Sequence, residues 1–256
     1  MQIAIGLRTC SSVENYWNTQ RFVNASKSTL ILTCLNSLLK SIKRCILDGH
    51  YVQFSIHDDN SDNETIDKMM DLCFEHGIPV EFFYTDKHRN FMSQYEWLQQ
   101  QKFDYAYCVE DDYLHKEYAL TDMINMCQNM RELVKLDGDF AVYPFNNPHR
   151  YNSFEMMYPS FILEGEKCYW RSILHSTHTF FVPKIAWDKY NEIMKYQADV
   201  WPSNDCFEDN TINKIWHEQF IKLICPMDSL AYHLADDSQK DRFGNWKILW
   251  ERNHNE

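Results

Sequence analysis

The first half of the sequence alternates short apolar segments with longer amphipathic ones. Residues 1–7 and 51–56 place apolar side chains at every second position, and another apolar run covers 80–83. A period of two is typical of strands. Residues 28–47, and a stretch that follows residue 61, repeat apolar side chains every three or four positions, which predicts helices. This order predicts a parallel sheet with helices on both faces.

Polar side chains follow several of these predicted strands. A further helix is predicted at 91–101, and a fourth strand at 105–109 leads straight into three carboxylates. Ligands of such sheets bind beyond the carboxyl ends of the strands, so we expect the polar residues there to converge on one crevice. These residues are Arg8, Asp58, Asp59, Glu110, Asp111 and Asp112.

The second half is less regular. We expect a helix at 118–135, a strand at 139–145, an aromatic-rich loop over 146–170, a strand at 178–182 and a helix at 184–196. No linker, repeat or low-complexity segment divides the sequence. We therefore predict one continuous domain over all 256 residues, which is a common size for an α/β domain.

Composition excludes several classes of protein. The formal net charge of −12 disfavours binding to nucleic acid, because an acidic surface repels phosphate backbones. Nine scattered cysteines without a Cys-x-x-Cys pair indicate a reduced protein rather than a zinc cluster. We see no signal peptide and no apolar run near the roughly 18 residues that cross a bilayer. The expectation is a cytoplasmic protein without a transmembrane segment.

The acidic triplet Glu110-Asp111-Asp112 needs a cation or solvent to relieve its repulsion. A hard divalent cation binds carboxylates and keeps positions open for phosphate oxygens, although a solvated turn is the simpler interpretation. Only six glycines occur, and neither glycine-rich phosphate-binding motif is present. A bound diphosphate would therefore have to be neutralised by a metal and basic side chains.

The turn at Asp58-Asp59 has two interpretations as well. It can bind a ligand beside the triplet, or it can cap the next helix, for which Ser61 and Glu64 have capping-box spacing.

Two segments resemble family 2 glycosyltransferases of GT-A type. The segment from Phe54 to Thr65 resembles their strand, Asp-Asp-x-Ser turn and helix, and Tyr107 to Leu114 resembles their DXD-type metal motif. The resemblance implies a GT-A fold, an α/β domain with a mostly parallel central sheet flanked by helices. It implies a nucleotide-sugar-binding half at 1–115 and an acceptor-binding half at 116–256.

The resemblance also implies roles for individual residues. Asp112 would be the chief ligand of Mn²⁺ or Mg²⁺, and His233 corresponds to a late histidine that many GT-A enzymes add to the metal, unless it is structural. The triplet reads Glu-Asp-Asp instead of Asp-x-Asp, which leaves the ligating carboxylate open. The implied donor-binding residues are Arg8, Asp58, Asp59, Lys87, Asn90, Glu110 and Asp111.

An inverting transferase needs a carboxylate base to deprotonate the acceptor hydroxyl. Family 2 enzymes place it in a downstream Glu-Asp pair, which Glu208-Asp209 resembles. We predict Asp209 as the base and Asp205 as second choice, with helix capping as the alternative role of Asp209.

Other polar and aromatic residues leave two interpretations open. A tail with Lys240, Arg242 and Lys247 could fold over a diphosphate or be a solvated charge run. His175 and His178 would point to opposite faces of a strand, which disfavours a shared metal. The tryptophans that could stack on an acceptor sugar, although core roles are more common, are Trp170, Trp187 and Trp201.

The sequence thus predicts a metal-dependent, inverting hexosyltransferase. It would move sugar from a nucleotide-diphosphate sugar, with a UDP-sugar favoured, to a hydroxyl of a glycan or other acceptor. One alternative is a non-catalytic module that binds nucleotide or sugar on the same fold. The other is a sugar nucleotidyltransferase, which generally has a glycine-rich loop that is missing after residue 8.

Overall fold

A single mixed sheet runs through the described part of the chain. The computed structural model describes residues 1–12, 23–86, 88–134, 139–151, 157–203, 205, 207–217, 221–235 and 245–254. The strands of the sheet are β1 (Gln2–Thr9), β2 (Tyr51–Asp59), β3 (Glu81–Thr85), β4 (Tyr105–Glu110), β6 (Asp139–Val142), β7 (Ile162–Glu164), β8 (Tyr169–Ile173), β9 (Phe180–Pro183) and β10 (Ile221–Pro226).

Across the sheet the strands lie in the order β3-β2-β1-β4-β9-β6-β10-β8-β7. The strands β3, β2, β1 and β4 are parallel, as are β6 and β10, whereas β9, β8 and β7 pair in antiparallel fashion. The predicted α/β class with a mostly parallel central sheet is therefore confirmed.

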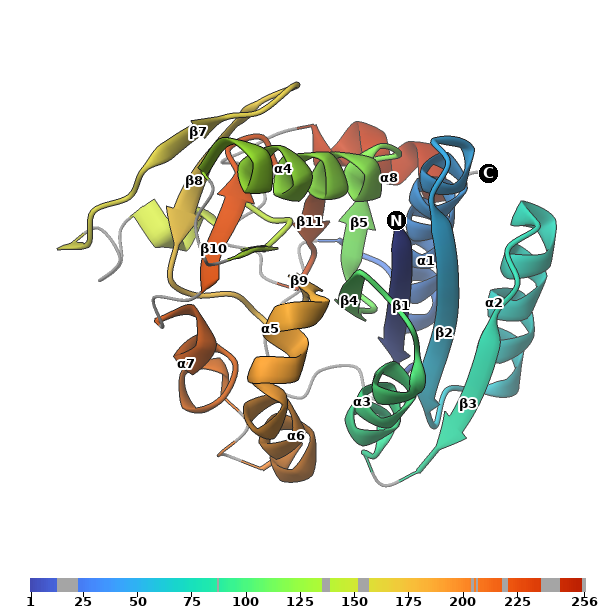
Figure 1. The fold of residues 1–256 in the computed structure, drawn as a ribbon. Helices are drawn as coiled ribbons and strands as arrows, with labels where there is room; N and C mark the ends of the chain where they lie inside the picture. Colours follow the sequence, from blue (N-terminus) through green and yellow to red (C-terminus); the bar gives the residue numbers. More distant parts are fainter. Residues whose placement is uncertain are drawn as a thin grey trace.

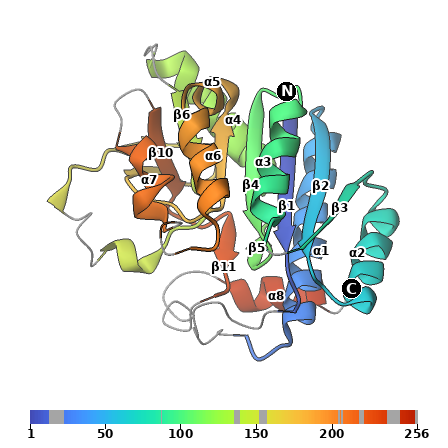
Figure 2. The same cartoon turned by 90° about the horizontal axis from the view of Figure 1, so that it is seen from below.

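Helices cover both faces of this sheet (Figures 1 and 2). Helix α3 lies on one face with α5 and α6, and α1, α2 and α8 lie on the other. No described helix is long and apolar enough to cross a membrane. The helices are α1 (Lys27–Leu47), α2 (Asn63–His76), α3 (Asn90–Gln100), α4 (Ala119–Val134), α5 (Lys184–Lys189), α6 (Asn191–Val200), α7 (Asn213–Trp216) and α8 (Trp246–His254), with 3₁₀ turns η1 (Pro148–Tyr151) and η4 (Glu208–Asn210).

The start of α2 differs from the predicted capping box by one residue. Asp62 is the N-cap, and its carboxylate accepts a hydrogen bond of 2.9 Å from the backbone N–H of Thr65. The hydroxyl oxygen of Ser61 instead accepts from the backbone N–H of Ser11, at 2.8 Å. Ser61 therefore joins the loop after β1 to the turn after β2, while Asp62 caps the helix.

The second half departs further from the prediction. The stretch 146–170, expected as a loop, contains β7 and the start of β8, and the expected helix at 184–196 is two helices that meet at Tyr190. Strand β8 pairs with β10, about fifty residues later in the chain. Such pairing leaves no local pattern, because the partner that completes the strand is remote in sequence.

A small two-stranded ribbon continues from the acidic triplet. It consists of β5 (Tyr113–His115) and β11 (Ala231–His233), which are antiparallel. The backbone N–H of Leu234 donates to the carbonyl of Asp112 at 2.9 Å, and His233 lies opposite Tyr113. The ribbon thus carries a histidine more than a hundred residues downstream back to the triplet.

Candidate active site

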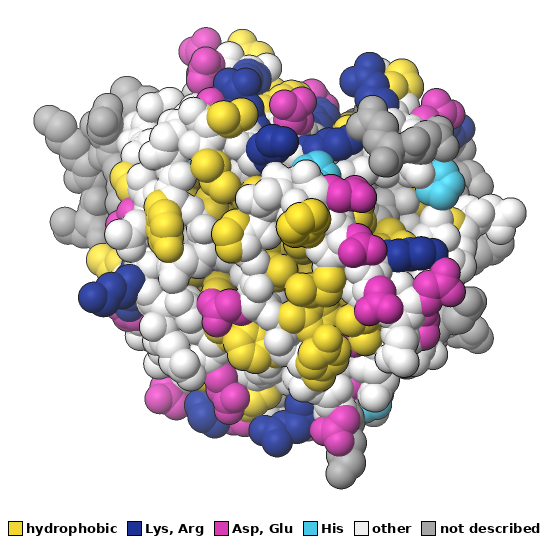
Figure 3. Space-filling view, turned by 90° about the vertical axis from the view of Figure 1, so that its right-hand side faces the viewer, with side chains coloured by type: hydrophobic (Ala, Val, Ile, Leu, Met, Phe, Trp, Pro, Cys, Tyr) yellow, Lys and Arg dark blue, Asp and Glu magenta, His cyan; other side chains and the backbone are white. Residues whose placement is uncertain are grey.

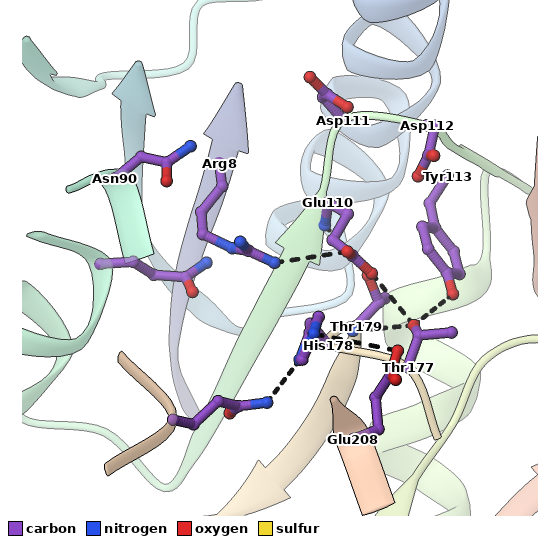
Figure 4. Close-up of polar contacts among 12 residues, drawn as sticks. Arg8, Asn90, Glu110, Asp111, Asp112, Tyr113, Thr177, His178, Thr179 and Glu208 are labelled. Carbon is purple, nitrogen blue, oxygen red and sulfur yellow. Dashed lines mark hydrogen bonds and ion pairs between the residues drawn. The ribbon is translucent and has the colours of Figure 1, made fainter. Parts of the chain in front are cut away.

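The polar residues that we expected to share one crevice lie close together where β1, β2 and β4 end. In the register of the sheet, Arg8 lies between His57 of β2 and Glu110 of β4, and Thr9 lies beside Asp58. Parallel pairing therefore gathers at one edge the polar residues that follow separate strands. Figure 4 shows Arg8, Glu110 and Glu208 around this edge.

Arg8 is buried although it carries a charge. Its side chain is 5% exposed, and its guanidinium lies 3.7 Å from the ring centroid of Phe91 and 5.3 Å from that of Trp201. Its Nη2 lies 3.5 Å from Oε1 of Glu110, while Nε and Nη2 have no hydrogen-bond partner. Burial lowers the pKa of Arg8, and Glu110 opposes that shift. Aromatic stacking and one carboxylate hold this cation, with N–H groups left over for a ligand.

Glu110, the first carboxylate of the triplet, is held by hydroxyl groups from the segment before β9. Thr177 Oγ1 and Thr179 Oγ1 donate to its Oε2 at 3.1 and 3.2 Å (Figure 4). Burial raises the pKa of Glu110, and the Arg8 charge lowers it. Arg8 and the two threonines thus hold this carboxylate in place at the end of β4.

Asp111 points away from the other two carboxylates (Figure 4). Its Oδ1 forms an ion pair with Lys27 at the start of α1, and its Oδ2 accepts from the backbone N–H of Cys10 at 3.1 Å. Both side chains of the ion pair are almost buried. The second carboxylate therefore joins β1, α1 and β4, and its predicted contact with a donor stays a prediction.

Asp112, the third carboxylate, faces His233. Its Oδ2 lies 3.3 Å from Nε2 of His233, whose ring stacks on Tyr113 with centroids 4.7 Å apart. Burial alone would lower the pKa of His233, but Asp112, Glu110 and Glu208 raise it to about 9. Likewise burial would raise the pKa of Asp112, and His233 holds it below its ordinary value. Negative charge therefore dominates this end of the site.

The residues around Asp112 fit part of a metal site. Asp112 Oδ1 is buried without a hydrogen-bond partner and is an oxygen ligand of the kind that Mn²⁺ and Mg²⁺ prefer, and the neighbouring His233 could add one nitrogen. Among the described residues, no three His, Cys, Asp or Glu side chains are arranged to hold a metal ion by themselves. Asp112 and His233 could therefore supply two positions, and phosphate oxygens and water would have to supply the others, as is usual for Mg²⁺ with phosphates.

The two aspartates after β2 have different surroundings. Asp58 accepts from Thr9 Oγ1 at 2.6 Å and from the backbone N–H of Ser61 at 2.9 Å, so it stabilises the turn. Asp59 is buried, its Oδ2 lacks a hydrogen-bond partner, and it lies 3.3 Å from Nδ1 of His88. Burial raises the pKa of Asp59. Of the two, only Asp59 offers an oxygen to a ligand.

Helix α3 contributes Asn90, its first residue. It is buried, its Nδ2 lies 3.5 Å from the carbonyl of Thr9, and its Oδ1 has no hydrogen-bond partner. Lys87, the other residue predicted there, lies outside the described residues.

Glu208 and Asp209 point in different directions. Asp209 is 79% exposed, accepts from Asn213 Nδ2 at 2.8 Å and lies 3.7 Å from Nε2 of His175. Glu208 is 31% exposed, and its Oε1 lies 3.9 Å from Nε2 of His178. Burial raises the pKa of Glu208, and the negative charge of Glu110 adds to that shift. Glu208 thus belongs to the crevice, while Asp209 sits over the first turn of α7.

The other predicted candidates lie apart from the crevice or outside the described residues. Asp205 is exposed, and Lys240 and Arg242 are not described. Lys247 lies on α8, where its Nζ is 5.7 Å from the ring centroid of Trp246. Trp170 and Trp187 are buried in the core, whereas Trp201 packs beside Arg8.

Several residues of the crevice left no signal in the sequence. Thr177 and Thr179 reach Glu110 from the segment just before β9, and Phe91 stacks under Arg8 from α3. Thr, Phe and Trp occur throughout the chain, so only their spatial neighbours distinguish these from core residues.

Unsatisfied buried atoms concentrate in this crevice. Among the described residues, five buried side-chain nitrogen or oxygen atoms of predicted site residues have no hydrogen-bond partner, although ion pairs reach two of them, Arg8 Nη2 and Asp59 Oδ2. A buried polar atom without a hydrogen bond costs about 1–3 kcal/mol, so a cluster of such atoms indicates a site for a polar ligand. The five are Arg8 Nε, Arg8 Nη2, Asp59 Oδ2, Asn90 Oδ1 and Asp112 Oδ1.

Comparison with solved structures identifies the architecture. The structure of S. aureus TarS 1–349 superposes with a TM-score of 0.56 at 13% identity, covering 91% of this chain and 60% of that one. The chain has a GT-A glycosyltransferase fold. TarS in a longer form gives a TM-score of 0.55 at 12% identity over 91% of this chain and 36% of that one. TarS 1–349 in complex with UDP-GlcNAc gives 0.51 at 14% identity, over 98% and 64%.

These comparisons concern the fold. The chain spans 36% of the longer TarS structure and 60% of the 1–349 structure. No family model matches the sequence, and a sequence search of curated proteins finds no match. The predicted GT-A fold is confirmed, and the activity must be argued from the crevice itself.

Proposed function

We propose that this protein transfers a sugar from a nucleotide-diphosphate sugar to an acceptor hydroxyl, with a divalent metal ion. One observation carries the proposal: five buried atoms of Arg8, Asp59, Asn90 and Asp112 that lack hydrogen-bond partners gather at the strand ends of a GT-A fold. They include donors and acceptors, and a ligand that satisfies all of them must itself contain both. A nucleotide-diphosphate sugar held with a cation has these groups.

The donor nucleotide would lie along the ends of β1, β2 and β4. Asp59 and Asn90 offer acceptor atoms to hydroxyl or amino groups, and Arg8 offers N–H groups to an anionic or carbonyl oxygen. TarS forms complexes with UDP and UDP-GlcNAc, which supports a uridine donor on this fold. A UDP-sugar is therefore the first donor to test.

Asp112 and His233 would hold Mn²⁺ or Mg²⁺. When bound, such an ion stabilises the negative charge that develops on the leaving diphosphate. The protein's own part is to fix His233 by its stack on Tyr113. His233 would have to lose its proton to bind the metal, because a histidine ligand is neutral. The cation would also offset the repulsion among the three carboxylates of the triplet.

Glu208 is the general base that the geometry favours. Its carboxylate enters the crevice near Glu110 and His178, whereas that of Asp209 is mostly exposed and bonded to Asn213. A raised pKa makes Glu208 a better proton acceptor than an ordinary glutamate. The acceptor oxygen would bond to the anomeric carbon as the carbon–phosphate-oxygen bond breaks. Glu208 would take the hydroxyl proton, and the sugar would invert. This assignment replaces Asp209, our sequence-based choice.

The test is release of nucleoside diphosphate from UDP-sugars with Mn²⁺, with and without acceptor glycans. We expect turnover by the wild type and loss by Asp112→Asn. Exposed Asp188→Asn, on α5, is the matched control and should keep full turnover. If the wild type binds UDP-sugars but releases no UDP with any acceptor, the protein is a binding module and the proposal is wrong.

A further inference from the structure

A second cavity lies between the C-terminal half of α1, α8 and the β5–β11 ribbon. Its volume is about 870 Å³, and none of the candidate active-site residues lines it. Cavities of 300–1,000 Å³ are typical of sites for small molecules. The cavity is therefore large enough for a ligand of its own.

The charge of this cavity is opposite to that of the chain. Five of its charged lining residues are basic and two are acidic, whereas the whole chain carries −12. On the face shown in Figure 3, several Lys and Arg side chains gather along the upper edge, above a central group of hydrophobic side chains with acidic side chains around it. A local excess of positive charge on an acidic protein attracts anions. The basic residues are Lys40, Lys43, Arg44, Lys116 and Arg252.

Ion pairs within the protein neutralise part of the positive charge of this cavity. Arg44 pairs with Asp48 at 2.9 Å, and Lys116 with Asp228 at 2.7 Å. Lys43 and Arg252 are exposed. The pKa of His76, which also lines the cavity, is lowered mainly by burial, and the Lys43 and Lys40 charges add to that shift. The remaining potential in the cavity is thus positive.

Apolar side chains stand next to these cations. Leu47 of α1 is 74% exposed and Ile248 of α8 is 48% exposed, and both line the cavity. A simple inorganic anion would leave these side chains in water. A ligand that matches the whole lining has an anionic group and an apolar part.

We propose that this cavity binds an amphiphilic phosphate ester, with Lys43 and Arg252 on the phosphate and Leu47 and Ile248 on the apolar chain. Both a soluble phosphate ester and an anionic lipid in a bilayer have this chemistry. The proposal does not depend on the glycosyltransferase activity.

The cavity is also connected to the candidate active site. Tyr232 lines the cavity, and the next residue, His233, faces Asp112. Successive residues of a strand point to opposite faces, so the cavity and the candidate active site lie on opposite sides of β11. A ligand in the cavity would contact the same ribbon that positions His233.

The test compares binding to two probes. The first is vesicles of phosphatidylcholine with equimolar phosphatidylglycerol, against vesicles of phosphatidylcholine alone. The second is hexyl phosphate, measured by calorimetry. The test variant is Lys43→Glu with Arg252→Glu. The control is Lys102→Glu with Lys189→Glu, which changes the net charge equally at exposed lysines outside the cavity.

We expect the wild type and the control to bind at least one probe, and the test variant to bind it at least about tenfold more weakly. Binding to hexyl phosphate alone would indicate a soluble ligand, and binding to anionic vesicles alone a membrane lipid. If neither probe binds, or if test and control variants lose the same affinity, the proposal is wrong. Lys43→Gln with Arg252→Gln, which removes charge without reversing it, serves if the first variant does not fold.

Discussion

The two halves of this molecule reach the same crevice in different ways. In the first, parallel strands β1, β2 and β4 end side by side, so neighbours in the sheet deliver Arg8, Asp59 and Glu110 together. In the second, antiparallel pairing and a ribbon bring Glu208 and His233 back from remote positions. The first half contributes all five site atoms that lack hydrogen bonds, and the second contributes the candidate for the general base. Donor binding and proton transfer should therefore be separable by mutation.

The largest expected effect concerns the second half. Glu208→Gln should lower kcat by about 10²–10⁴-fold, because a glutamine cannot take the acceptor proton. Binding of UDP should change by less than about twofold, since the base does not touch the nucleotide. Steady-state kinetics and calorimetry measure the two quantities.

Asp209→Asn is the matched control, because it alters the adjacent carboxylate in the same way. It should keep kcat within about threefold of wild type, since surface substitutions have small effects. The opposite pattern, with Asp209 essential and Glu208 dispensable, would restore the sequence-based choice and reject the assignment of Glu208.

The second prediction separates adjacent carboxylates of the triplet. Asp111→Asn should lower the free energy of unfolding by about 3 kcal/mol, because it removes the carboxylate that forms an almost buried ion pair with Lys27. Asp112→Asn should lower it by less, because relief of the repulsion of Asp112 with Glu110 and Asp111 partly offsets the lost ion pair with His233. Urea denaturation measures both. Equal losses would contradict the distinction between a structural and a ligand-binding aspartate.

The last prediction concerns the first half alone. His57 is buried, and burial lowers its pKa to about 3, with the Arg8 charge adding to the shift. The unfolded chain binds a proton there below about pH 6.5, whereas the folded chain does not. The buried, neutral His57 therefore costs the fold nothing above pH 6.5. As the pH falls from 6.5 toward 3, the free energy of unfolding decreases by about 1.4 kcal/mol per pH unit.

Denaturation at several pH values measures this slope, and His57→Gln supplies the comparison. In the variant, the slope of the free energy of unfolding against pH should fall by the equivalent of about one proton. The substitution also disturbs the 2.8 Å contacts of His57 with Ser55 and Ser93, which changes the free energy at every pH. An unchanged slope between pH 4 and 6 would show that His57 is not the group responsible.

The parallel half was predictable because its signals are local. Strand alternation, helix periodicity and the polar residues after each strand follow from contiguous sequence, so the crevice with Arg8, Asp59 and the triplet was expected before the structure was known. The resemblance to family 2 glycosyltransferases added roles for Asp112 and His233, which the structure places 3.3 Å apart.

The rest could not be predicted, for physical reasons that differ by residue. Pairing of β8 with β10 joins remote segments, so 146–170 looked like a loop. Choosing between Glu208 and Asp209 requires the direction of each side chain, which a short 3₁₀ turn decides and no periodicity reveals. Which carboxylate of the triplet is already engaged depends on Lys27, more than eighty residues earlier.

The central claim is that Asp112 and His233 bind a divalent metal together with a nucleoside diphosphate. The most direct measurement is calorimetric titration of UDP with and without Mn²⁺, in the wild type and in Asp112→Asn. We predict that Mn²⁺ tightens UDP binding at least about tenfold in the wild type and by less than about twofold in the variant. Equal effects of Mn²⁺ on both proteins, or UDP binding without any dependence on Mn²⁺, would contradict the account.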